Sequence, residues 1–212
     1  MSATALRPLL AEGHRRARLA APFLGALSLA AARVHEFCGP ARRTLALLAA
    51  RAIPGPVVWI RAGWLPERLH PEGVLAFIEP GRLVFVTAAR PEDLLWCTEE
   101  ALRAGAAPLV VADLPEPPRL TPVRRLQLAA ETGAAAAIGL RLAPPLGLLL
   151  TPGDGGAQGA ETRWRLVPRH DPGHRRWRLS LLRARATPPA EWDLSSHSGG
   201  FVLAPARPVT ET

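Results

Sequence analysis

Arginine is concentrated in the last third of the sequence, in two stretches that have the pattern of β-strands. In Thr162–Val167 and again in Arg176–Arg183, arginines alternate with tryptophan or leucine, so that each kind of side chain would occupy one strand face. We expect the tryptophans to face the core. An arginine face can bind a phosphate backbone or an acidic protein, with plain solvation as the alternative. The side chains that we predict to contact DNA or a partner are Arg163, Arg165, Arg175, Arg176, Arg178 and Arg183.

The composition narrows the chemistry that the chain can perform. All 26 basic side chains are arginine and the net charge is +8, which favours a nucleic acid or an acidic protein as partner. Because the 212 residues include no lysine, no reaction that needs a side-chain amine can occur. Cys38 and Cys97 are the only cysteines and lie far apart, which argues against a disulfide framework and fits a reducing cytoplasm.

Two further groups of residues have the types, but not the arrangement, of catalytic or metal sites. His170, Asp171 and His174 have a loose metal-like spacing, but no fourth ligand stands at a useful distance. Ser195–Ser198 contains serine and histidine without the G-x-S-x-G turn of a nucleophile elbow. We therefore predict no metal and no catalytic residue.

Short apolar runs alternate with amphipathic segments, which predicts βαβ units. Strands are expected at Val34–Cys38, Pro56–Ile60, Arg82–Val86, Leu109–Ala112 and, more weakly, Ala134–Leu140. Helices are expected at Arg42–Ala52, at Glu72–Ile78, from Pro91 to a stop at Gly105, and from a cap at Thr121 to a stop at Gly133. After a glycine-rich loop at Thr151–Ala160, the pattern changes to antiparallel strands at Thr162–Val167, Arg176–Arg183, Glu191–Leu194 and Phe201–Ala204.

These elements predict an α/β fold, with a mostly parallel sheet flanked by helices and ending in antiparallel strands. We divide the chain into a short Ala/Arg-rich segment 1–33, one domain 34–205 and a tail 206–212. Leu24–Ala32 within the first segment has helical spacing. The apolar run ahead of residue 33 is too short to span a membrane, so no membrane contact is expected.

Several segments resemble a known family. Val34-His35-Glu36-Phe37-Cys38-Gly39-Pro40-Ala41-Arg42-Arg43-Thr44-Leu45 resembles the strand, phosphate loop and helix that open a RecA core. Pro56–Leu65, Arg82–Val86, Arg90–Gly105 and Leu109–Asp113 follow in RecA-like order. More specifically, the chain resembles the ImuA family of bacterial mutasomes over about residues 20 to 205. That match is carried by Arg90–Trp96, Glu99–Gly105, Leu120–Thr121, Arg124–Glu131, Thr162–Arg165, Trp177–Leu179 and Leu181–Arg185.

The resemblance implies a degenerate nucleotide site made of Gly39, Arg42, Arg43, Thr44 and Asp113. A phosphate loop follows the frame G-x-x-x-x-G-K-[ST], but here the loop is shorter, the second glycine is missing and Arg43 replaces the lysine. Gly63 stands where RecA proteins carry the glutamate that orients water. We therefore predict a pseudo-ATPase without a cofactor, although the helix N-terminus retains some attraction for the phosphates of ATP.

What the ImuA resemblance implies is a cytoplasmic, nucleoid-associated accessory protein of damage-induced, error-prone translesion DNA synthesis. Its partners would be an ImuB-like inactive relative of the Y-family polymerases, an error-prone replicative-type DNA polymerase and, as an open option, DNA. Two alternatives remain at this stage. One is a DNA-binding RecA paralogue with residual nucleotide binding, and the other is a cell-division inhibitor resembling SulA.

Overall fold

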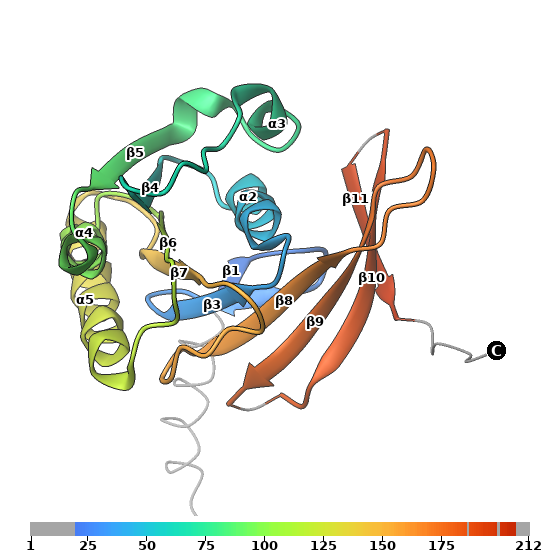
Figure 1. Ribbon diagram of the computed structural model, residues 1–212. Helices are drawn as coiled ribbons and strands as arrows, with labels where there is room; N and C mark the ends of the chain where they lie inside the picture. Colours follow the sequence, from blue (N-terminus) through green and yellow to red (C-terminus); the bar gives the residue numbers. More distant parts are fainter. Residues whose placement is uncertain (1–19, 186, 199, 207–212) are drawn as a thin grey trace, which may run out of the picture.

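A single nine-stranded sheet organises the computed structural model, which describes residues 20–185, 187–198 and 200–206 (Figure 1). The strand order is β11-β10-β9-β8-β3-β7-β6-β4-β5. Strands from β8 to β5 in that order run parallel, whereas β8, β9, β10 and β11 form an antiparallel meander. The strands are β3 (Val34–Cys38), β4 (Val57–Ala62), β5 (Leu83–Ala88), β6 (Leu109–Asp113), β7 (Leu146–Leu150), β8 (Thr162–Pro168), β9 (Arg176–Ala184), β10 (Ala190–His197) and β11 (Gly200–Pro205). The predicted α/β class, with a mostly parallel sheet that ends in antiparallel strands, is confirmed.

Helices cover both faces of the parallel part of the sheet, as the alternating pattern predicts (Figure 1). Helix α2 (Arg42–Ala52) packs on one face, while α4 (Pro91–Ala104) and α5 (Leu120–Gly139) pack on the other. A short helix α3 (Pro71–Leu75) and a 3₁₀ turn η1 (Pro80–Arg82) lead into β5. In the part of the chain that the structure describes, no helix is long and apolar enough to cross a membrane.

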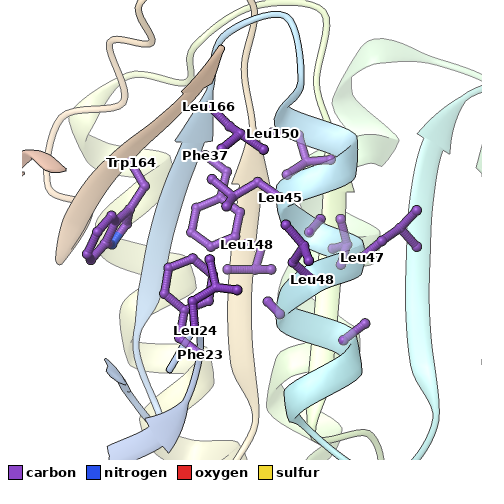
Figure 2. Packing of buried hydrophobic residues seen from close by; sticks show 14 of the residues in the cluster. Phe23, Leu24, Phe37, Leu45, Leu47, Leu48, Leu148, Leu150, Trp164 and Leu166 are labelled. Carbon is purple, nitrogen blue, oxygen red and sulfur yellow. The ribbon is translucent and has the colours of Figure 1, made fainter. Parts of the chain in front are cut away.

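The core on the α2 face joins three parts of the chain that are far apart in sequence. Leu45 and Leu48 of α2 pack onto Phe37, Leu148 and other apolar side chains of the sheet (Figure 2). Phe23 precedes the hairpin turn and lies against Phe37, with ring centroids 5.3 Å apart. Two short strands, β1 (Ala20–Pro22) and β2 (Ser28–Ala30), form this hairpin. The residues ahead of position 34 thus supply part of the core.

The helical spacing of Leu24–Ala32 is misleading, because this stretch contains a turn and strand β2. Gly25 and Ala32 both have positive φ, 54° and 56°, which no right-handed helix accommodates. Pro22 ahead of the turn fits the edge of a small sheet, not a helix interior. The Ala/Leu spacing therefore predicts the wrong secondary structure. Leu24 and Leu29 are nevertheless buried, as residues of a core stripe would be.

Most predicted elements lie where the sequence places them, but the predicted strand at Ala134–Leu140 is wrong. Helix α5 begins at Leu120, with Arg119 and not Thr121 at the N-cap, and continues through Gly133 to Gly139. The strand that follows it in the sheet is β7, a fully buried run of leucines around Gly147. Gly133 thus lies inside a helix and does not end it.

Position 133 requires a glycine because α4 and α5 touch at this point. A Cβ atom on Gly133 would lie 1.9 Å from the carbonyl oxygen of Leu102, near the end of α4. The last turn of α4 closes with Gly105 in the left-handed conformation, at φ 61°. A Cβ there would lie 2.3 Å from the carbonyl oxygen of Gly133. The two glycines allow backbone-to-backbone contact between the helices, which tertiary packing requires and local propensity does not reveal.

Gly133→Ala should destabilise the protein, although alanine is the better helix former. Because the new methyl group meets a backbone carbonyl, we expect a loss of about 1–3 kcal/mol in the free energy of unfolding. Gly139→Ala is the matched control, since no atom lies within 4 Å of a Cβ at that position. That change should leave stability unchanged or raise it slightly. Urea denaturation of both variants measures the difference, and equal stability of the two would contradict the close contact.

A buried histidine attaches the β1–β2 hairpin to the main sheet. The Nε2 atom of His35 lies 2.9 Å from the carbonyl oxygen of Ala30, so that nitrogen carries the proton and donates. Its Nδ1 atom lies 2.7 Å from the Thr162 hydroxyl and accepts a hydrogen bond from it. Burial lowers the pKa of His35 from 6.5 to about 4. The imidazole is therefore neutral in the folded protein at neutral pH.

This neutral histidine predicts a loss of stability in mild acid. Between the unfolded pKa of 6.5 and the folded pKa of about 4, only the unfolded chain gains the proton, so stability falls as the pH drops through this window. The shift corresponds to roughly 3 kcal/mol. Urea unfolding at neutral pH and near the lower pKa should show a smaller pH effect in His35→Gln than in the wild type. His174→Gln, at an exposed position, should retain the full effect.

Candidate functional site

The loop between β3 and α2 is short and tightly packed. Gly39 has φ 87°, and its N–H donates to the carbonyl oxygen of Gly153 at 2.9 Å. A Cβ on Gly39 would lie 2.7 Å from the carbonyl oxygen of Leu166 in the neighbouring strand β8. The N–H of Ala41 donates to that same oxygen at 3.2 Å. One N–H group of the loop thus donates to β8, and another donates to the glycine-rich segment.

An ion pair joins the predicted nucleotide-site residues. The Nε atom of Arg43 donates to Oδ2 of Asp113 at 2.5 Å, and Nε of Arg42 lies 3.9 Å from Oδ1 of the same carboxylate. Asp113 ends β6, and β7 separates β6 from β3, so the guanidinium of Arg43 reaches across one strand. The Asp113 side chain is only 9% exposed. The structure therefore brings Gly39, Arg42, Arg43, Thr44 and Asp113 together at the carboxyl ends of the parallel strands. The Asp113 carboxylate is already neutralised there by Arg43.

Gly63 lies just beyond the carboxyl end of β4, packed against β5. Its N–H donates to the carbonyl oxygen of Ala88 at 2.8 Å, and a Cβ would lie 2.9 Å from that oxygen. A side chain at this position would have to displace the β5 backbone. A glutamate at this position, which the RecA resemblance would require, has no room without that displacement.

A cavity of about 430 Å³ opens beside the β3–α2 loop. Arg43 and Thr44 of the predicted nucleotide site line it, together with apolar side chains such as Leu47 and Val74. No aspartate or glutamate lines it among the residues that the structure describes. The site has room for a ligand, and its lining favours an anion.

The predicted alternation of the arginine strands is confirmed. Trp164 and Leu166 of β8 and Trp177 and Leu179 of β9 are buried in the α2-side core. The arginines between them lie on the opposite face, as period two requires. We therefore expect no base stacking by these tryptophans.

Most of the predicted arginines form ion pairs within the protein. Arg163 pairs with Glu36, Arg165 with Asp154 at 3.2 Å, Arg176 with Asp171 at 3.0 Å, and Arg178 with Asp193 at 2.9 Å and Glu191 at 3.0 Å. Arg175 and Arg183 are exposed and, within the described residues, form no ion pair. The acids come from other strands and loops, so the sequence alone does not reveal that this basic face is largely neutralised.

Sequence reasoning missed Glu36, which has no exposed surface. One carboxylate oxygen, Oε1, accepts from the Thr151 hydroxyl at 2.8 Å and from the N–H groups of Gly156 at 2.7 Å and Ala157 at 2.9 Å. The other oxygen accepts from Nε of Arg163. The one available signal was an acid in the middle of an apolar strand, which must be paired when buried. Glu36 fixes the path of the glycine-rich loop Thr151–Ala160.

The predicted absence of a metal site concerns His170, Asp171 and His174. The Nδ1 atom of His170 accepts the N–H of Arg176, and its ring meets Trp177 edge-on at 5.0 Å. Asp171 pairs with Arg176, so these side chains serve the β8–β9 hairpin. Throughout the described ranges, no group of three or more His, Cys, Asp or Glu is placed to hold a metal ion.

No protein-family model matches the sequence, and no curated protein matches it either. The geometry of the β3–α2 loop and the local sequence resemblance are therefore the grounds for a functional proposal.

The contact with Glu36 makes Arg163 structural, which an alanine variant can test. Arg163→Ala leaves a buried carboxylate short of one charged donor, so we expect a loss of about 2–3 kcal/mol in the free energy of unfolding. Arg183→Ala, which removes an exposed arginine from the same strand face, should change it by less than about 0.5 kcal/mol. Chemical denaturation of both variants makes the comparison. An undiminished stability of Arg163→Ala would mean that this arginine is free to bind a ligand.

Proposed function

We propose that this chain is a RecA-like pseudo-ATPase that acts as an accessory protein in damage-induced, error-prone DNA synthesis, through protein–protein binding. The observation that carries the proposal is the ion pair between Arg43 and Asp113. In a phosphate-loop enzyme, the two corresponding groups bind the nucleotide phosphates and the Mg²⁺ ion. Here the Arg43 guanidinium and the Asp113 carboxylate bind each other instead.

This pairing is incompatible with efficient phosphoryl transfer, which depends on positioned positive charge around the phosphates. A planar guanidinium bound to a carboxylate offers less to a phosphate than a free ammonium in a ring of backbone amides. The Gly39 and Ala41 amides are also engaged by carbonyl oxygens at 2.9 and 3.2 Å. Together with the backbone contact of Gly63 at the end of β4, these engaged amides argue against a phosphate cradle and a catalytic base among the described residues.

The scaffold itself supports the RecA-like part of the proposal. Strand β3 and its loop lie at the middle of the nine-stranded sheet, beside the parallel strand β7, and Asp113 ends a second buried strand nearby. Fold does not fix function, so the role in translesion synthesis follows from the ImuA resemblance described above. The partners that it suggests are an ImuB-like inactive polymerase homologue and an error-prone replicative-type polymerase.

The ion-paired arginines favour protein over DNA as the main partner. A surface that tracks a phosphate backbone needs arginines whose charge is available to replace counterions. On β8 and β9, Arg163, Arg165, Arg176 and Arg178 already face carboxylates. DNA binding by a RecA paralogue with residual nucleotide affinity is therefore the weaker proposal.

Partner capture tests the proposed function directly. The tagged chain, co-expressed with the ImuB-like polymerase homologue of the same bacterium, should retain that protein through affinity and size-exclusion steps. Because the phosphate site is closed by Arg43 and Asp113, retention should be the same with and without ATP and Mg²⁺. A folded chain that captures no such partner would refute the accessory role. DNA-stimulated ATP turnover in the usual enzymatic range, about 1 to 10³ per second, would refute the pseudo-ATPase.

A further inference from the structure

Two cavities on the α2 side of the sheet adjoin each other, and we refer to them together as the groove. The cavity of about 430 Å³ beside the β3–α2 loop shares Phe77, Arg175 and Trp177 with a second cavity of about 300 Å³. The groove follows α2 and the α3 segment on one side and the β8–β9 and β10–β11 hairpins on the other. Figure 1 shows α2 and α3 facing this curved end of the sheet.

Basic side chains line the groove along its whole length. Four separate stretches of the chain contribute its arginines and histidines, which are Arg43, Arg51, Arg68, His70, His170, Arg175 and His197. No aspartate or glutamate lines either cavity within the described part of the chain. Such a convergence from distant segments concentrates positive potential in a concave surface.

Three of these arginines carry charge that no carboxylate in the described residues neutralises. Arg51 donates to the Phe77 carbonyl oxygen at 3.4 Å, and Arg68 donates to the carbonyl oxygens of Leu65 and Glu67. Arg175 is exposed, and among the described side chains it has no ion-pair partner. The groove therefore differs from the opposite, arginine-bearing sheet face, where the charges are paired internally.

The floor of the groove is suited to aliphatic side chains more than to bases. Leu47, Leu69 and Val74 line the larger cavity. The rings of Phe77 and Phe201 stack on each other at 5.5 Å, and the guanidinium of Arg51 lies 5.9 Å from the Phe201 centroid. Since one face of each of these rings is already covered, less aromatic surface is left for stacking on the bases of a single-stranded nucleic acid.

We propose that this groove binds an extended acidic segment of a protein partner, whose carboxylates meet Arg51, Arg68 and Arg175 while its aliphatic side chains rest on the floor. Guanidinium groups bind carboxylates through paired, charge-assisted hydrogen bonds, which suits an acidic peptide. The choice of a protein as occupant rests on the proposed function. The charge and apolar lining of the groove are independent of it.

A peptide titration tests the groove. The probe is a short fluorescein-labelled peptide of alternating Glu and Leu, and the same peptide with Lys in place of Glu is the control probe. Fluorescence anisotropy with the full chain should show binding of the acidic probe only, weakening as salt increases. R68E/R175E should lower the affinity at least about tenfold, because two favourable contacts become repulsive. R119E/R124E makes the same charge change at the start of α5, away from the groove, and should stay within about twofold.

Other outcomes would overturn the proposal. These are equal binding of the two probes, equal loss in R119E/R124E, or groove-dependent binding of oligothymidine without binding of the peptide. Self-association that R68E/R175E abolishes would instead assign the groove to a second copy.

Thermal melts check that the variants fold, and R68Q/R175Q repeats the measurement if the charge reversal lowers the Tm. If R68E/R175E still captures the polymerase homologue, the groove is wrong and the accessory role stands. If the wild type binds the peptide but captures no polymerase homologue, the groove stands and the accessory role fails.

Discussion

The carboxylate of Glu36, fully buried in the central strand, constrains much of this structure. An ionised group in that position is stable only when several donors surround it, and the cost of leaving it unpaired is several kcal/mol. The donors come from the end of β7, from the backbone of the glycine-rich loop and from Arg163 on β8. Gly155 passes so close that a Cβ would lie 2.7 Å from the carboxylate. One charge thereby determines the route of the connection between β7 and β8, the composition of its loop and the role of one arginine.

The same requirement divides the many arginines of this chain into two groups. On the open face of β8 and β9, each of four arginines meets a carboxylate from another strand or loop, and the surface gains order but little net potential. On the α2 side, Arg51, Arg68 and Arg175 bind carbonyl oxygens or none of the described groups, and their charge remains available. The net charge of +8 is therefore a poor guide to where a partner binds. What matters is which arginines the fold leaves without an acid.

The sequence predicts local structure well wherever local physics decides it. Strand β3 and helix α2 begin and end at the predicted residues, and α4 begins at Pro91 and closes on Gly105 as its end signals require. The prediction fails where a residue serves a distant contact. Gly133 has the pattern of a helix stop, but its size is set by the α4 backbone, and the leucine run of β7 lacks the β-branched residues that mark a strand. In the candidate site, the sequence identifies Arg43 and Asp113 but not their mutual contact, and it does not reveal Glu36.

The contact between Arg43 and Asp113 joins segments that a bound nucleotide holds together in phosphate-loop proteins. In a nucleotide-dependent protein, phosphate and metal ion hold the loop and the neighbouring strand ends together, and their loss releases these segments. Here a guanidinium and a carboxylate 2.5 Å apart join the start of α2 to the end of β6 through protein groups alone. The β3–α2 loop is further fixed by its amide contacts to Gly153 and Leu166. In the proposed function, this internal bridge would take the place of a nucleotide switch and would hold the wall of the adjoining groove in place without a ligand.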